Sequence, residues 1–538
     1  MRAFTVALLT IVGCTSAQTA PPTLEVTTPA RGAVSGSDEI TVTGTATNAD
    51  QVTVNGIAVT PDKTGAFSAA IQLQAGIGII ETHAISGGDD VRDVRAVLTG
   101  ALAPTDGSVK APVGAFATVA ALKSIGNAMA TDAKAIDYTA AVQPLNPVYD
   151  NGGCLGATIN ITNVALGDVK VGLAPAAGSL GTTVTIDDVV VTLHASFKVA
   201  CIGGSTTITL KASAAHLTGG LAVKVSQGKL ETSIGDVSVV LDGFSLDVGS
   251  VPGAIANLFD STVRGKVESA LTSVIHDKVP AIANKALAGL VAKPVAASIL
   301  GKSTTLGIVP SAVTVSATGV YVAMESTIEV DGGDGAMVLS QPVAMTADLI
   351  DHAHGVGLAV ANDAVDQLFG GLWAAGAFEK SLPIASVGPL AAILDPAATT
   401  LDIQLSLPPT VTTDLSGLEL AVGDLIVTTH DDTNTVIQQI AVSLQTSLTT
   451  AAGTDNKLAL AVGAPTVHAQ VIAQAASVAR PLTDSEVESI VTSVWGIVGS
   501  SANEALGKLP MPAFGGIHLG APAISGVAGY VVADIALQ

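Results

Sequence analysis

The chain has 538 residues, of which 48% are hydrophobic, 13% charged and 3% aromatic, and its mean hydropathy is +0.56. This apolar content excludes a disordered chain. Proline, glutamine and glycine interrupt its long uncharged stretches, which excludes a polytopic membrane protein. The formal net charge is −22 and Lys and Arg form no cluster, so nucleic acid and anionic lipid surfaces are excluded as electrostatic partners.

The first residues have the form of an export signal. A basic start precedes the apolar run 3–12, which is too short to span a bilayer. The run ends in a glycine and Cys14, and so resembles the bacterial lipoprotein signal, in which that cysteine is acylated. We therefore expect a signal peptide at 1–13, a lipidated tether at 14–22 and a lipid-anchored protein of the bacterial envelope, at the outer membrane or cell surface. Cleavage by an ordinary signal peptidase after Ala17 is the alternative.

The cysteine count is odd for an exported chain. If Cys14 carries the lipid, Cys154 and Cys201 remain as one pair. Both lie among strand-like segments in a compartment that should be oxidising, and this predicts a disulfide. Two buried free thiols are the alternative.

Residues 23–100 read as short strands separated by turns. Asn55-Gly56 supplies the positive φ angles of a two-residue hairpin turn within 52–59, and further strands are predicted at 66–73, 79–85 and 91–98. This spacing predicts a β-sandwich. The segment resembles bacterial immunoglobulin-like repeats, which act as spacers, and residues 103–108 have the composition of a linker.

After the linker, β-rich stretches lead into a long amphipathic segment. Strands are predicted at 159–164, 184–193, 206–210 and 237–246, and a helix is predicted from Pro252 onward. Pro280 should kink this helix. Its apolar positions form one stripe, which predicts a buried face: Ile255, Leu258, Phe259, Val263, Val267, Leu271 and Ile275.

The same theme occurs a second time. A strand is predicted at 356–360, followed by a helix at 363–378 that carries Val365, Leu368, Phe369, Leu372 and Trp373. Further on, a capping box at Thr483 to Glu486 opens a helix with Val491, Val494 and Trp495 on one side, and closing strands follow.

The order of these elements resembles the tubular lipid-binding superfamily of the bactericidal/permeability-increasing protein. The resemblance lies in residues 255–271, in residues 356–376 and in residues 494–534. It implies an α+β body of two elongated barrels, at 104–345 and 346–538, each a curved antiparallel sheet around a long helix. The body would follow an all-β immunoglobulin-like sandwich.

The resemblance also implies a function and its site residues. The chain would hold or transfer lipid in apolar tunnels, lined by the three apolar stripes named above. The chain lacks the basic tip of the lipopolysaccharide-binding members, and its cysteine pair joins two strand-like segments rather than a strand and the long helix. The expected ligand is therefore a phospholipid or another hydrophobic molecule. A helical stripe also fits a packed core, so a cell-surface adhesion or scaffold lipoprotein without ligand is the alternative.

Motifs that would carry catalysis or bind a cofactor have no support. The sequence Gly301-Lys302-Ser303 matches the end of the phosphate-binding loop motif, but position 296 is alanine where that motif needs glycine. Asp348, Asp351, His352 and His354 could form a metal-binding cluster. They lie at the start of a predicted strand, where alternating side chains point to opposite faces, and this disfavours a metal site. We therefore expect no enzyme activity, no cofactor and no metal; protein partners are not specified by the sequence.

Overall fold

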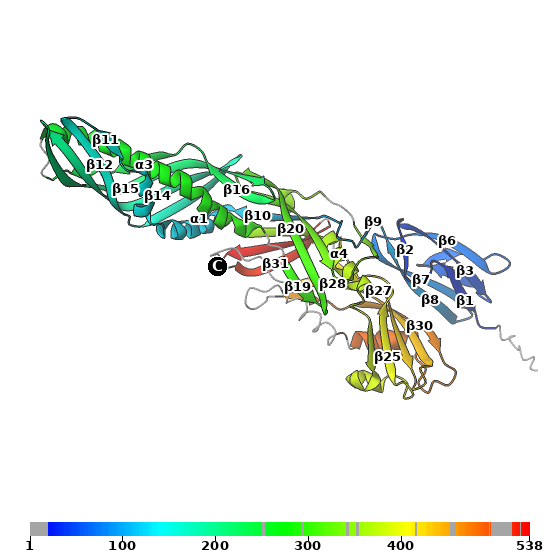
Figure 1. Ribbon diagram of the computed structural model, residues 1–538. Helices are drawn as coiled ribbons and strands as arrows, with labels where there is room; N and C mark the ends of the chain where they lie inside the picture. Colours follow the sequence, from blue (N-terminus) through cyan, green and yellow to red (C-terminus); the bar gives the residue numbers. More distant parts are fainter. Residues whose placement is uncertain are drawn as a thin grey trace, which may run out of the picture.

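The computed structural model of the chain describes residues 20–249, 253–291, 295–340, 344–350, 355–414, 417–451, 459–493, 495, 519–527 and 529–537. The molecule is elongated and consists mainly of β-strands (Figure 1). A small β-sandwich lies at one end, a long sheet with helices lies at the other, and a further sheet lies beside the sandwich (Figure 1). Within the described residues, no helix combines the length and apolar character that a membrane crossing requires.

The N-terminal unit is the predicted β-sandwich. Its two sheets share one core that includes Val42, Val52 and Phe67. Asn55 and Gly56 have φ angles of 46° and 77°, which confirms the predicted hairpin turn. One sheet has the order β1 (Thr23–Thr28), β3 (Glu39–Thr47), β6 (Ala66–Gln72); the other has the order β2 (Ala33–Ser35), β8 (Asp89–Thr99), β7 (Gly76–Ser86), β4 (Gln51–Val54), β5 (Ile57–Val59).

The first half of the body is an eight-stranded antiparallel sheet packed against helices. Side chains along its strands alternate between buried and exposed, so one face forms the interior. Helices α1 (Val119–Lys134), α2 (Tyr138–Val142) and α3 (Gly253–Leu287) share a single hydrophobic core with that face. The strands are β11 (Tyr149–Asn151), β12 (Leu155–Ala165), β13 (Val169–Ala176), β14 (Ser179–Val199), β15 (Ile202–Ser226), β16 (Lys229–Ile234), β17 (Ser238–Asp242) and β18 (Ser245–Asp247).

A seven-stranded sheet connects the two halves of the body. Strand β10 lies between β21 and β23, so segments from both sides of the predicted boundary at residue 345 belong to one sheet. Its order is β19 (Val295–Ile299), β20 (Lys302–Ser316), β21 (Gly319–Val330), β10 (Ala111–Thr118), β23 (Val356–Ala361), β32 (Tyr530–Leu537), β31 (Leu519–Val527).

The second half has its own sheet and two shorter helices. Helix α4 (Asn362–Ala374) follows β23, and a helix at 484–493 packs on β28 and β30. Thr483 N–H donates to Glu486 Oε2 at 2.9 Å, and Glu486 N–H donates to Thr483 Oγ1 at 3.3 Å, which confirms the predicted capping box. The strands are β24 (Lys380–Pro383), β25 (Thr400–Leu405), β26 (Thr410–Asp414), β27 (Gly417–His430), β28 (Val436–Ala451), β29 (Ala459–Val462) and β30 (Thr466–Gln474).

Helix α3 contains Pro280 and extends beyond it to Leu287. One detail differs from the sequence-based expectation. The segment expected to be a linker is held in place, because β9 (Leu102–Pro104) pairs with β22 (Met337–Leu339) and Thr105 Oγ1 donates to the carbonyl of Gly333 at 2.6 Å. Polar residues of this segment therefore form hydrogen bonds with the body.

The sandwich is docked on the second-half sheet through a buried ion pair. Arg31 Nη1 donates to Asp424 Oδ1 at 2.7 Å, and Asp424 Oδ2 accepts from the backbone N–H groups of Gly32 and Ala96 at 3.2 and 3.1 Å. The Asp424 side chain is only 1% exposed. Burial raises the pKa of Asp424, and the Arg31 guanidinium opposes that rise.

A second ionic cluster and an apolar cluster extend this contact. Arg92 Nη2 donates to Glu488 Oε1 at 2.6 Å, and His468 Nδ1 lies 2.8 Å from Glu81 Oε1. The hydrogen bond to His468 lowers the pKa of Glu81. The apolar cluster combines residues of the sandwich and the body: Ile77, Ala96, Leu98, Leu339, Leu407 and Ala421. The sandwich therefore does not stand apart from the body as a free spacer would.

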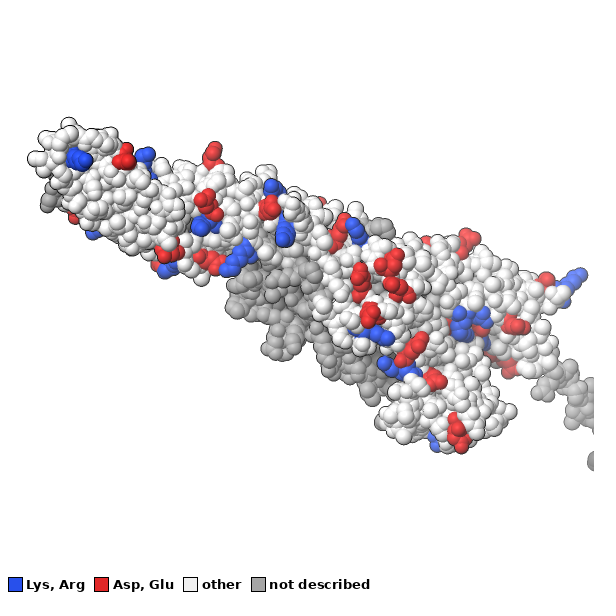
Figure 2. Space-filling model, viewed as in Figure 1, with Lys and Arg blue, Asp and Glu red and all other residues white. Residues whose placement is uncertain are grey.

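Charged side chains are spread over the molecular surface. On the face shown in Figure 2, Lys and Arg side chains lie interspersed with Asp and Glu side chains. Several pairs of opposite charge are close and exposed, for example Lys170 Nζ and Asp187 Oδ2 at 2.8 Å. Exposed pairs of this kind contribute little to stability, about 0–1 kcal/mol.

Candidate functional site

The predicted apolar stripe of the long helix lies in the interior of the first half. Val263, Val267, Leu271 and Ile275 are each at most 4% exposed and belong to the core that α3 shares with the sheet. The side chains of Ile255, Leu258 and Phe259 lie outside the described part of the structure. The described part of the stripe therefore faces the sheet.

Helix α1, which the sequence analysis missed, forms the other side of this region. Thr118 caps it, because Thr118 Oγ1 accepts from Ala121 N–H at 3.3 Å. A Cβ at Gly126 would lie 2.5 Å from the carbonyl oxygen of Val171, so this glycine permits close packing on β13. The signal available in the sequence was the threonine cap followed by a stripe at helical spacing: Leu122, Ile125, Met129 and Ala133.

A small cavity lies where α1 and α3 meet strands β13 and β14. Its volume is about 20 Å³, which is room for about one water molecule. Tyr138 and Lys278 are the lining residues with polar side chains, and burial raises the pKa of Tyr138. The other lining residues are apolar: Met129, Ala133, Ile136, Val171, Val184, Ile186, Val274, Ile275, Val279 and Ile282. Ile275 is the predicted lipid-binding residue that the structure places here.

The second predicted set lies on α4 and is separate from this cavity. Leu372 is buried, and Val365, Leu368, Phe369 and Trp373 are half-buried. Trp373 Nε1 donates to the carbonyl of Leu405 at 2.7 Å. Leu368, Phe369 and Leu372 pack in a cluster distinct from the α3 core. The structure therefore does not bring the described α3 and α4 residues into one site.

The most buried face of α4 is polar, which sequence reasoning did not foresee. Asn362, Asp363, Asp366 and Gln367 are all buried, and Asp366 is 1% exposed. Asp366 Oδ1 accepts from Val411 N–H at 2.8 Å, while Oδ2 has no hydrogen-bond partner among the described residues. Burial raises the pKa of Asp366 well above its usual range. The neutral acid is therefore the form that this site favours.

Replacing Asp366 by asparagine is expected to remove a loss of stability that grows as pH rises above the unfolded pKa of the carboxyl group. The pKa of Asp366 is raised in the folded chain, so its stabilising contribution is present below the unfolded pKa and is lost as pH rises through the folded pKa. Asparagine keeps an acceptor for Val411 N–H and carries no charge. Urea unfolding of both proteins at several pH values measures the free energy of unfolding. This free energy should increase in the variant relative to the parent as pH rises. A difference that does not change with pH would contradict the raised pKa of Asp366.

The third predicted set lies around the helix at 484–493. Val491 is half-buried and packs with Val487 on the second-half sheet, and Trp495 Nε1 donates to the carbonyl of Gly463 at 2.7 Å. Val494 lies outside the described residues. These side chains contact the sheet of the second half, away from the cavity at α1 and α3.

Of the residues that the sequence suggests for metal binding and for the membrane anchor, only Asp348 lies in the described part of the structure. Among the described residues, no group of three or more His, Cys, Asp and Glu side chains is arranged to hold a metal ion. Asp351, His352 and His354 lie outside the described residues, as does Cys14. Asp348 lies in a short 3₁₀ helix at Ala347–Leu349, rather than at a strand entrance.

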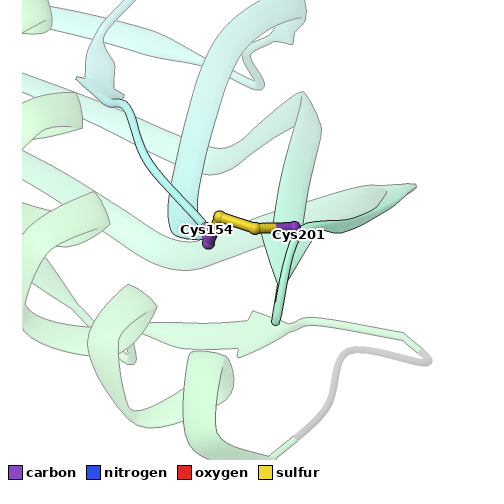
Figure 3. Close-up of a disulfide and its surroundings, with 2 residues drawn as sticks. All are labelled: Cys154 and Cys201. Atoms are coloured by element: carbon purple, nitrogen blue, oxygen red, sulfur yellow. A yellow bond between two sulfur atoms is a disulfide. The ribbon is translucent and has the colours of Figure 1, made fainter.

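The predicted disulfide between Cys154 and Cys201 is present (Figure 3). Cys154 precedes β12, Cys201 lies in the turn between β14 and β15, and Cys201 N–H donates to the carbonyl of Cys154 at 3.2 Å. The bond therefore ties together the start of β12 and the turn between β14 and β15.

Replacing both cysteines by serine is expected to destabilise the first half by about 2–4 kcal/mol, because the bond restricts the unfolded chain. Urea unfolding of the variant, compared with the parent under oxidising and reducing conditions, measures this loss. The reduced parent should unfold like the variant. Equal stability of the oxidised and reduced parent would contradict the expected contribution.

Comparisons with known proteins concern both parts of the chain. Residues 22–98 match the family model described as glucodextranase, domain B. No curated protein sequence matches the chain. The crystal structure of lipopolysaccharide binding protein is similar with a TM-score of 0.48 and 13% identity, over 80% of this chain and 99% of that chain. P47 of Clostridium botulinum E1 is similar with a TM-score of 0.25 and 8% identity, over 80% of this chain and 100% of that chain.

Proposed function

We propose that the chain binds a phospholipid or another hydrophobic molecule in the first half of its body, between α1, α3 and strands β13 and β14. The observation that carries this proposal is the cavity there, with its apolar lining and two polar residues. Ligand sites commonly combine apolar walls with a few placed polar groups. Acyl chains would contact the apolar walls, and the exposed Lys278 would pair with a headgroup phosphate.

Ligand entry requires α1 and α3 to separate, because the cavity of about 20 Å³ does not admit an acyl chain. The polar contact between these helices is weak. Lys285 Nζ lies 2.9 Å from both carboxylate oxygens of Asp132, and the Lys285 side chain is 72% exposed. An exposed pair contributes about 0–1 kcal/mol. Apolar side chains of both helices belong to one hydrophobic core, and acyl chains would take the place of these side chains.

The proposed ion pair between Lys278 and the headgroup phosphate is tested by replacing Lys278 with methionine. Phospholipid binding should weaken by up to about fivefold, since an exposed ion pair contributes at most about 1 kcal/mol. Lys266→Met is the matched control, because Lys266 is also exposed on α3 but does not line the cavity. Fluorescent phospholipid titration measures both. Equal weakening by the two variants would contradict a specific role for Lys278.

The wider proposal concerns architecture and location. Two tubular barrels would each surround a helix, and acylated Cys14 would anchor the chain to the bacterial envelope, where it would hold or transfer lipid without enzyme activity. Replacing Cys14 by serine is expected to move the protein from the membrane fraction to the soluble fraction, because the acyl anchor is lost. Unchanged membrane fractionation would contradict the anchor.

A second candidate function is a cell-surface adhesion or scaffold protein with solidly packed barrels. The observation that favours it is the small volume of the cavity, together with the deep burial of the α3 stripe. The two candidates differ in one measurable property, the uptake of lipid by the purified chain.

A further inference from the structure

A much larger cleft lies between the sandwich and the second-half sheet. Its volume is about 400 Å³, within the range of small-molecule sites. The sandwich contributes Asn55 of the β4–β5 turn, the end of β6, β7 and the segment between these two strands, and the body contributes residues of β26, β27, β28 and β30. We propose that this cleft binds a neutral, hydroxyl-rich small molecule of the saccharide class. The site is independent of the proposed lipid site in the first half.

The polar groups of the cleft fit a neutral ligand. Its lining contains amide, hydroxyl, imidazole and carboxylate side chains and neither lysine nor arginine, and the nearby Arg92 Nη1 lies 3.7 Å from Glu81 Oε1, where it balances that carboxylate. Both carboxylates already have partners: Glu81 Oε1 lies 2.8 Å from His468 Nδ1, and Glu419 Oε1 accepts from Gln445 Nε2 at 3.1 Å. An anionic ligand is therefore disfavoured by the two carboxylates, and the amide and hydroxyl groups match the donors and acceptors of a neutral ligand.

Other polar side chains of the cleft remain available to a ligand. The side chains of Gln72 and Gln74 are exposed, and no described residue hydrogen-bonds to either side-chain amide. An amide both donates and accepts, as does each sugar hydroxyl. Leu73 and Ile79 add apolar surface beside these amides, which suits the C–H faces of a sugar ring. This combination of groups selects a compact molecule with several hydroxyls.

The walls of the cleft are fixed before any ligand binds. The buried Thr410 Oγ1 accepts from Ile77 N–H at 3.3 Å, which joins the body to the sandwich at the base of the cleft. A Cβ at Gly76 would lie 2.9 Å from Thr412 Cγ2, so the two units approach closely there. The Arg31–Asp424 pair adds a further buried link. A preformed site lowers the entropic cost of binding.

The test uses maltose, cellobiose and lactose as neutral probes, with glucuronate and glucosamine as charged probes. Saturation-transfer NMR on the full chain detects binding, and calorimetry measures affinity. The variant is Gln72→Leu with Gln74→Leu, and the matched control is Gln51→Leu, an exposed glutamine of the same sandwich that does not line the cleft.

At least one neutral disaccharide is expected to bind more tightly than either charged probe. The double variant should weaken that binding at least about tenfold, and the control should leave it unchanged. Phospholipid uptake should be the same in all three proteins. The proposal is overturned if no neutral probe binds at millimolar concentration, if a charged probe binds best, or if the double variant binds as the parent does.

Discussion

Replacing Leu271 by arginine is expected to abolish uptake of a fluorescent phospholipid while the sandwich and the second half stay folded. Leu271 is 2% exposed in the middle of the α3 stripe. Truncation of such a leucine to alanine costs about 2–5 kcal/mol, and arginine adds the cost of a charge in an apolar interior. The first half should therefore lose the packing between α3 and the sheet that the proposed site needs.

The matched control is Ser269→Arg, which places the same side chain on the exposed face of α3. This control should bind lipid as the parent does. Urea unfolding followed by circular dichroism reports whether the chain unfolds in one cooperative step, and limited proteolysis identifies the parts that remain folded. Cooperative unfolding of the whole Leu271→Arg chain would contradict the expectation and would favour solidly packed barrels.

Replacing Arg31 by methionine is expected to release the sandwich from the body. The change leaves the Asp424 carboxylate buried without its cation, and breaking a buried pair in this way costs about 3–5 kcal/mol. Hydrogen exchange at the amides of Gly32 and Ala96, which both donate to Asp424, should accelerate by roughly a hundredfold or more. Lys63→Met is the control, because Lys63 is an exposed cation of the sandwich.

Acid should partly restore docking in the Arg31→Met variant. Burial already raises the pKa of Asp424, and loss of the guanidinium raises it further. A carboxyl with a raised folded pKa contributes stability below its unfolded pKa, and this contribution is lost as pH rises through the folded pKa. The protection of these amides, which is their exchange rate relative to the intrinsic rate at the same pH, should therefore increase in the variant at acid pH. Exchange as slow as in the parent near neutral pH would show that the ion pair does not hold the sandwich.

The elements defined by local patterns could be predicted from the sequence. The Asn55-Gly56 hairpin and the capping box at Thr483 depend on residues within one turn, and both are confirmed. Alternation along the strands of the first half likewise reflects one buried face. The disulfide followed from cysteine parity and an oxidising compartment.

Features that depend on distant residues could not be predicted. The ion pair between Arg31 and Asp424 joins positions 393 residues apart, and neither residue carries a local signal for it. The buried face of α4 is another case. An aspartate such as Asp366 is usually exposed to solvent, and its hydrogen bond from Val411 N–H forms only when the chain is folded. The large cleft arises from the same docking, since its walls come from two units.

Native mass spectrometry of the purified full-length chain tests lipid binding most directly. The Cys14→Ser variant is used so that an anchor acyl group is not counted as ligand. We expect a complex heavier than the chain alone, and the molecule extracted from it should have the mass of a phospholipid or another hydrophobic molecule. The amount of this complex should fall in the Leu271→Arg variant. A chain that carries no lipid and takes up no fluorescent phospholipid would contradict the proposed function.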